Sequence, residues 1–190
     1  SDDIYEHIRY EGFNFFTIAQ ISKLKERTLT MNGVSKSYAM TGWRIGYAAG
    51  PKEIINAIRK IQSQSTSNPS SISQAAAVEA LNGQQNFIKE RAEAFRERRD
   101  FVVNSLNNIK GINCLTPNGA FYVFPSCKEL LNKKTKLKTD TEFVQKLLEK
   151  SMVAVVQGSA FGLDGYFRIS YATSMENLKK AVARIKDFCD

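Results

Sequence analysis

Histidine and cysteine are scarce in this sequence. It contains one histidine, His7, and three cysteines, Cys114, Cys127 and Cys189, which are far apart and form no CxxC pair. A single histidine excludes histidine-based metal clusters, and it leaves only His7 for a Ser-His or Cys-His nucleophile pair. The number and spacing of the cysteines favour neither a disulfide framework nor a zinc site. We therefore expect no metal site, and reduced thiols with structural roles.

Long apolar runs and a targeting segment are also absent. No stretch approaches the roughly 20 apolar residues that a membrane-spanning helix requires. The first residues, Ser1 to Asp3, include neither a basic segment nor an apolar signal core. The sequence starts without an initiator methionine, on a polar Asp-Asp pair. We expect a fragment or cleaved product of a cytoplasmic protein, with no membrane partner.

Positive charge is in excess, with a formal net charge of +8. A basic domain can bind nucleic acid. Many of the basic residues, however, alternate with acidic ones in segments such as 89–91 and 96–100, which is typical of solvated helix faces. The nearly pure basic run 133–138 has no interleaved aromatic residues and favours an exposed loop. The charge distribution therefore argues against a nucleic-acid partner.

The first half of the sequence predicts strands followed by helices. Two β-prone runs, 27–31 and 43–49, predict short strands around a loop. Pro51 suits the first position of a helix. The segment 84–109 predicts one amphipathic helix of roughly 39 Å. The helix after Pro51 is expected to bury one face, formed by Ile54, Ile55, Ile58 and Ile61.

The second half predicts a compact α/β domain. Its expected strands are 112–115, 120–124, 152–156 and 166–171. Thr139 with Glu142, and Thr173 with Glu176, each match the capping-box pattern at the start of a helix. The final helix is amphipathic. The fold class is therefore α/β.

Lys36 lies in a loop of small residues directly after a β-prone run. A lysine nucleophile must be partly desolvated and near other cations, so that its amine is neutral often enough to attack a carbonyl. Position alone favours an exposed loop lysine. The surrounding string 33–46, GVSKSYAMTGWRIG, resembles the cofactor-attachment signature of the class I and II aminotransferases of fold type I. The resemblance extends over essentially the whole chain.

This resemblance implies a cofactor, pyridoxal 5′-phosphate, and roles for the residues around Lys36. Lys36 would form the Schiff base with the cofactor and then move a proton between the substrate and the cofactor. Arg44 would hold the cofactor phosphate through two parallel hydrogen bonds. Many relatives carry a phosphate-binding serine at the position of Gly33, and Ser35 is the residue here that could replace it.

Residues near both ends of the sequence complete the implied site. Asp2 would pair with the protonated ring nitrogen, and Tyr5, three residues later, would donate to the phenolic oxygen of the cofactor. Asp3 is the competing carboxylate, and without the resemblance the Asp-Asp pair reads as a frayed end. Arg168, in the string GYFRISYA, would bind the substrate α-carboxylate, where the alternative is a salt bridge on a strand. Segments 118–122 and 158–162 also resemble family elements.

The implied architecture is part of a pyridoxal-phosphate-binding large domain, 1–83, a long bridging helix, 84–110, and a small α/β domain, 111–190. The sequence of these motifs most resembles that of bacterial aspartate aminotransferases. The expected reaction therefore moves an amino group from aspartate or a similar amino acid to 2-oxoglutarate by a ping-pong mechanism. The expected partners are an amino acid, a 2-oxo acid and a second copy of the chain. The fragment alone is expected to be inactive. Aromatic, prephenate or alanine aminotransferases, a non-catalytic dimerisation piece and a nucleic-acid-binding module are the alternatives.

Overall fold

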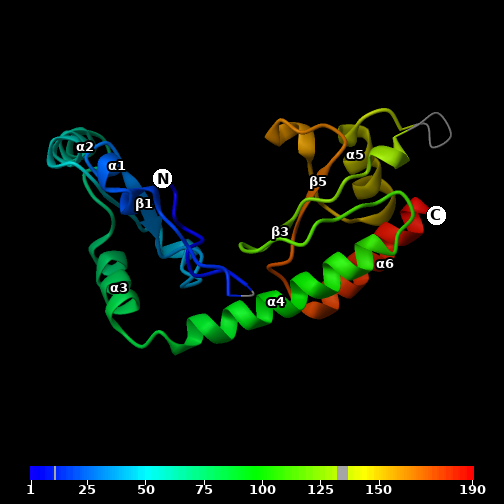
Figure 1. Ribbon diagram of the computed structural model, residues 1–190, viewed down its shortest axis with the longest axis horizontal. Coiled ribbons are helices and arrows are strands. Elements are labelled where there is room, and N and C mark those ends of the chain that lie inside the picture. Colours follow the sequence, from blue (N-terminus) through cyan, green and yellow to red (C-terminus); the bar gives the residue numbers. More distant parts are fainter. Residues whose placement is uncertain (11, 132–136) are drawn as a thin grey trace. The chain divides into compact units, whose positions relative to one another are not determined.

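The computed structural model describes residues 1–10, 12–131 and 137–190, which form two compact units, Ser1–Ala92 and Glu93–Asp190 (Figure 1). The division falls inside the helix α4 (Asn86–Asn107). The boundaries 1–83, 84–110 and 111–190 remain a prediction. Most of the predicted basic loop 133–138 lies outside the described residues. None of the helices in the described ranges combines the length and apolar character needed to span a bilayer.

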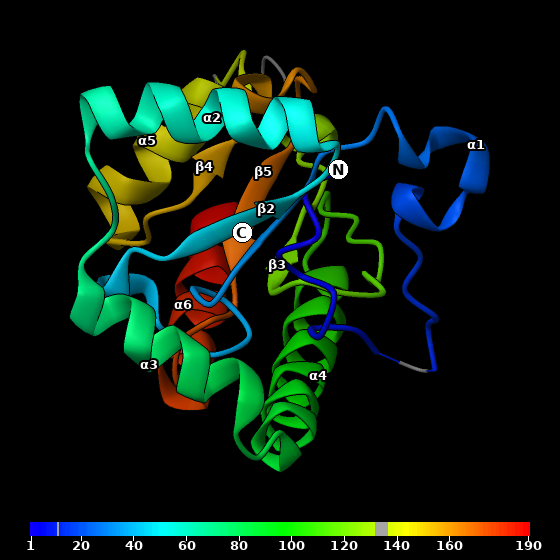
Figure 2. The ribbon, with the colours of Figure 1, turned by 90° about the vertical axis from the view of Figure 1, so that its left-hand side faces the viewer.

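Unit 1 is built around two antiparallel strands, β1 (Thr30–Gly33) and β2 (Gly46–Ala49), which pair from Thr30↔Ala49 to Gly33↔Gly46. Asp2 adds a parallel bridge to Met31 on the other side of β1. Two longer helices lie above and below the strand pair in the view of Figure 2, α2 (Lys52–Ser65) and α3 (Ser71–Asn82). The short helices of this unit are η1 (Ile18–Gln20), α1 (Ser22–Lys25) and η2 (Thr41–Trp43).

The strands and helix α2 differ from the prediction in informative ways. β2 begins only at Gly46, because Thr41–Trp43 forms a 3₁₀ turn and Arg44 has a left-handed φ of 55°. α2 follows Pro51 as predicted, but no residue of α2 is buried. The prediction that α2 buries one face is wrong for the described structure, because a two-stranded sheet offers too little surface to cover that face. Ile54, Ile58 and Ile61 are 44%, 38% and 70% exposed.

Unit 2 places helices around a small antiparallel sheet of order β3-β5-β4. The strands are β3 (Tyr122–Val123), β4 (Val156–Gln157) and β5 (Phe167–Ser170), and the helices are η3 (Lys128–Leu130), α5 (Asp140–Ser151), η4 (Gly158–Phe161) and α6 (Met175–Cys189). The second half of α4 runs beside α6 (Figure 1). Apolar side chains of these helices and of β5 form the core, including Val102, Leu106, Phe143, Leu147, Phe167, Leu178 and Ile185.

The strands of unit 2 are shorter than predicted, and one capping prediction is wrong. Segment 112–115 contributes only an isolated bridge, Asn113↔Ser126. Thr139 caps α5 as predicted, since its Oγ1 accepts a hydrogen bond from the Glu142 backbone N–H at 3.1 Å. α6 is capped instead by Ser174, one residue later than predicted, because the Ser174 Oγ accepts from the Asn177 N–H at 3.2 Å.

Candidate active site

Three segments of unit 1 meet at the same edge of the β1–β2 sheet. The Met31 N–H donates to the Ser1 carbonyl and the Asp3 N–H donates to the Met31 carbonyl, both at 2.8 Å, so the start of the chain runs parallel to β1. Because the first residues of the chain and β1 are parallel, both segments end at the same edge of the sheet. The antiparallel strand β2 begins at that edge. The structure thus brings these predicted site residues to one edge: Asp2, Tyr5, Ser35, Lys36 and Arg44.

The two neighbouring carboxylates near the start of the chain have different environments. Asp3 is 5% exposed, and its Oδ1 accepts a hydrogen bond from the Ser1 Oγ at 2.7 Å. Asp2 is exposed, and its Oδ1 accepts only from the Ile4 N–H at 3.2 Å among the residues described. Successive residues of an extended segment point to opposite faces. Asp2 is therefore the more accessible of the two carboxylates.

The loop that carries Lys36 is fixed by its backbone. The Met40 N–H donates to the Val34 carbonyl at 3.3 Å, and the Ala39 N–H donates to the Lys36 carbonyl at 3.0 Å. Val34 is fully buried and packs with Ile45. Lys36 and Ser35 are both half-buried. The backbone of Lys36 is consequently held on a defined turn.

Tyr38 anchors this loop to the segment at the start of α4. Its hydroxyl donates to the Gln85 Oε1 at 3.0 Å, and its ring meets the Phe87 ring edge-on at 6.0 Å between centroids. Burial, and then the nearby Glu6 carboxylate, raise the pKa of Tyr38, which keeps the phenol protonated and able to donate. The sequence alone does not assign Tyr38 to the site. Its position two residues after Lys36 was the available signal.

Gly33 and Arg44 lie at the same edge of the sheet, at the end of β1 and just before the start of β2. The Arg44 Nη1 donates to the Thr41 carbonyl at 2.8 Å, and the exposed guanidinium makes no ion pair with any described residue. Its remaining N–H groups can bind an anion. A Cβ added to Gly33 would lie 3.0 Å from the Ile45 carbonyl oxygen. A serine at position 33 would therefore require a shift of the strand, so glycine suits this close pairing.

Arg168 lies in unit 2, on β5, paired with Val156 of β4. Its Cζ is 4.5 Å from the centroid of the Tyr122 ring and 4.4 Å from that of the Phe161 ring. No carboxylate in the described part of the chain pairs with this guanidinium, so the strand salt bridge considered from the sequence is not seen there. The sequence alone assigns neither Tyr122 nor Phe161 to the site, because ring contacts between separate elements leave no local sequence signal.

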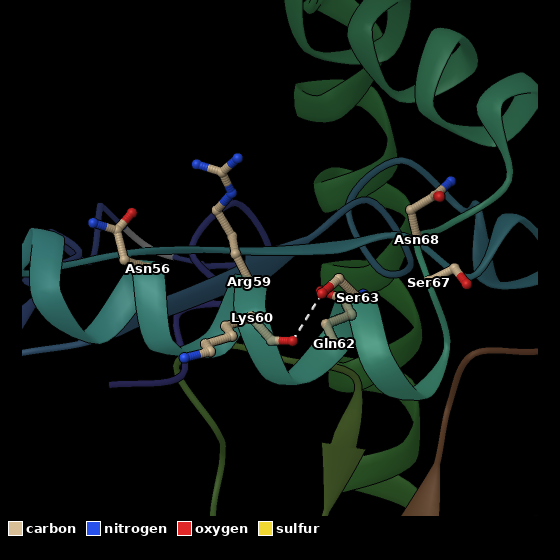
Figure 3. Close-up of a pocket in the computed structure, with 7 residues that line it drawn as sticks. All are labelled: Asn56, Arg59, Lys60, Gln62, Ser63, Ser67 and Asn68. Atoms are coloured by element: carbon tan, nitrogen blue, oxygen red, sulfur yellow. Dashed lines mark hydrogen bonds between the residues drawn. The ribbon is translucent and has the colours of Figure 1, made fainter.

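A pocket of about 530 Å³ lies beside the second half of α2, away from the residues of the sheet edge (Figure 3). It contains none of the predicted site residues. Figure 3 shows the side chains of Arg59 and Lys60 pointing away from each other, so the two cations do not converge on one ligand. Nearby carbonyls at the C-terminal end of a helix also disfavour an anion. The sheet edge, and not this pocket, is the candidate site.

Comparisons with known proteins agree on one family. The family model "Aminotransferase class I and II" matches residues 1–185. An aspartate aminotransferase of Rhizobium meliloti (strain 1021) is 61% identical over 100% of this chain and 47% of its own length. A Rickettsia typhi protein named "Probable aspartate/prephenate aminotransferase" is 56% identical over 100% of this chain and 49% of its own length.

A solved structure gives the same result in three dimensions. The crystal structure of the aspartate aminotransferase from Rhizobium meliloti matches with a TM-score of 0.95 and 61% identity, over 99% of this chain and 48% of that chain. The chain thus spans about half the length of the curated relatives that it matches.

Proposed function

Since this chain belongs to the class I and II aminotransferases, we propose that the full-length protein transfers an amino group from aspartate or a similar amino acid to 2-oxoglutarate. The transfer would use pyridoxal 5′-phosphate in a ping-pong mechanism. The observation that carries the proposal is the gathering of a carboxylate, a phenol, an amine and a guanidinium at one edge of the β1–β2 sheet. The chain alone, at half the relatives' length, is proposed to be inactive.

The residues at this edge fit the functional groups of that cofactor. Asp2 would pair with the ring nitrogen and Tyr5 would donate to the phenolic oxygen. Lys36 would bind the carbon of the aldehyde, and Arg44, with Ser35, would hold the phosphate. Each of these pairings joins groups of complementary charge or hydrogen-bonding type. When bound, the cofactor supplies an electron-accepting ring for the electrons released at the substrate α-carbon.

The protein side chains then perform binding and proton transfer. Arg168 would bind the substrate α-carboxylate and orient the α-carbon, and the Lys36 Nζ would remove and return the α-proton. Asp2 would stabilise the protonated, positively charged ring nitrogen, because a carboxylate stabilises a neighbouring cation. Tyr38 holds the turn on which Lys36 sits. Each role depends on a side chain fixed by the backbone of a strand or its adjoining turn.

Substrate choice is a finer part of the proposal. A relative named for both aspartate and prephenate supports prephenate as a second substrate. Aromatic amino acids and alanine are further candidate donors, and rates measured with each amino donor would rank them. A homodimer and a cytoplasmic location belong to the proposal too. A non-catalytic piece would bind no cofactor, and a nucleic-acid-binding module would show oligonucleotide affinity that falls steeply with salt.

The proposal is tested with the full-length protein and pyridoxal 5′-phosphate. We expect a visible absorbance band from cofactor joined to a lysine, and aspartate-dependent amino transfer. Lys36→Ala should abolish both, whereas Lys52→Ala, which changes a lysine of the same unit outside the proposed site, should preserve both. A band that survives Lys36→Ala, or transfer that does, would overturn the assignment.

A further inference from the structure

The guanidinium of Arg168 has an unusual set of neighbours in unit 2. Its Cζ lies over the Tyr122 ring at 4.5 Å and over the Phe161 ring at 4.4 Å from the centroids. All five N–H donors of a guanidinium lie in its plane. An aromatic ring attracts the cation through its face but accepts no in-plane hydrogen bond as a carboxylate does. The two ring contacts therefore restrain the arginine without occupying its N–H groups with a carboxylate.

The two rings come from different neighbours of β5. Tyr122 belongs to β3, on one side of β5, while Phe161 ends η4, which directly follows β4 on the other side. The pairing Tyr122↔Ser170 fixes the first ring along the strand. A guanidinium in contact with rings from a strand and from a 3₁₀ helix has little freedom to rotate.

A buried carboxylate fixes the loop that presents Phe161. The Asp140 Oδ2, on a residue only 3% exposed, accepts a hydrogen bond from the Ser159 N–H at 2.7 Å. The Gly158 N–H donates to the Tyr166 carbonyl, also at 2.7 Å. The Phe161 ring is 48% exposed, so it contacts Arg168 without depending on the core for its position. Its placement depends on η4 and on an edge-on contact with the Phe124 ring, at 5.9 Å between centroids.

An ion pair would hold an arginine equally well, but with a different consequence for binding. A carboxylate partner would have to be displaced before a substrate carboxylate could bind, which would reduce affinity. Arg168 has no such partner in the described ranges, and its aromatic neighbours need not be displaced for an anion to bind. The arrangement is thus pre-organised for a carboxylate ligand.

We propose that Tyr122 and Phe161 are positioning residues that hold the Arg168 guanidinium so that its N–H groups receive a substrate carboxylate. This inference rests on the proposed function, in which Arg168 binds the α-carboxylate. It adds two residues that act through Arg168 and need not touch the cofactor. Their contribution is to the binding of the carboxylate and not to the proton transfer by Lys36.

The test measures succinate binding to the full-length holoenzyme by calorimetry, together with KM and kcat for aspartate. Tyr122→Leu and Phe161→Leu should each raise the succinate Kd and the aspartate KM by about 3- to 20-fold, the range expected for a partly desolvated cation–π contact. Because the positioning acts on binding, kcat should change less than KM. Tyr122→Phe keeps the ring and should bind succinate within about twofold of the wild type.

Phe188→Leu is the control, because Phe188 is a half-buried aromatic residue of unit 2 whose described ring contact is with Phe143. It should leave the succinate Kd unchanged. Folding of Phe161→Leu is not at issue, since the ring is half exposed. Wild-type succinate affinity in both leucine variants, an equal loss in Tyr122→Phe, or no succinate binding by the wild type would overturn the proposal. The lysine-linked cofactor band reports separately on the proposed function.

Discussion

At the scale of single residues, the three cysteines show how burial controls chemistry. Burial raises the pKa of Cys114 to about 11 and that of Cys189 to about 12. Burial, and then the Asp140 carboxylate, raise the pKa of Cys127 to about 12. The thiolate is the reactive form. The structural role expected for these thiols from the sequence is consistent with their free, largely buried state.

A pH dependence of stability follows from these thiols. Their folded pKa values lie above the ordinary value of 9.0, so the folded state keeps protons that the unfolded state has lost. The free energy of unfolding should be unaffected by them below about pH 9 and should fall as the pH rises from 9 toward 12. Urea unfolding at several pH values checks this. Cys127→Ala should make the fall less steep, and an identical pH profile in that variant would contradict the account.

Gly158 is a second position where one residue controls a larger feature. A Cβ there would lie 2.3 Å from the Leu163 carbonyl oxygen and 2.8 Å from the Tyr166 Cβ. The backbone would have to move, because such distances are far inside van der Waals contact. Gly158→Ala should therefore destabilise the protein by about 1–3 kcal/mol, the range for overpacked sites, in urea unfolding.

The control for Gly158 is Gly42→Ala, since an added Cβ at position 42 meets no atom within 4 Å. It should change the unfolding free energy by less than about 0.5 kcal/mol. Gly158→Ala should also weaken succinate binding, because η4 begins at Gly158 and carries Phe161. Equal stability of the two variants would show that the loop can relax without strain.

At the scale of elements, helices were predicted better than strands. The 3.6-residue pattern predicted α2, α4 and α6 within a few residues, because a helix satisfies its backbone hydrogen bonds within its own segment. A strand ends where its partner ends. Of the predicted strand 152–156, only Val156 belongs to β4, which pairs at two positions with β5. The length of β4 is therefore set by pairing with residues that are distant in the sequence.

The start of α6 gives a test at this scale. The sequence favoured Thr173 as the cap, whereas the Ser174 hydroxyl accepts the hydrogen bond from the helix N–H of Asn177. Ser174→Ala should cost about 1 kcal/mol of unfolding free energy, the typical loss of an N-cap. Thr173→Ala should cost less, since among the described residues the Thr173 Oγ1 accepts only from the exposed Asn177 side chain. Thermal unfolding of the two variants compares them, and a larger loss for Thr173→Ala would restore the sequence assignment.

At the scale of the whole molecule, the predicted fold class is confirmed. The chain is α/β and carries part of the fold type I architecture of its family. The string around Lys36 made this predictable, because its spacing of lysine, arginine and glycine is specific. The aromatic contacts of Arg168 and the anchoring of the lysine turn by Tyr38 were not predictable, since they join residues from separate elements.

The most direct test of the account locates the cofactor on the chain. The full-length protein, incubated with pyridoxal 5′-phosphate, is reduced with borohydride, digested and analysed by peptide mass spectrometry. We predict that the pyridoxyl phosphate is found on the peptide containing Lys36 and that aspartate added before reduction lowers the yield. Label spread over exposed lysines, or absent from Lys36, would contradict the central claim.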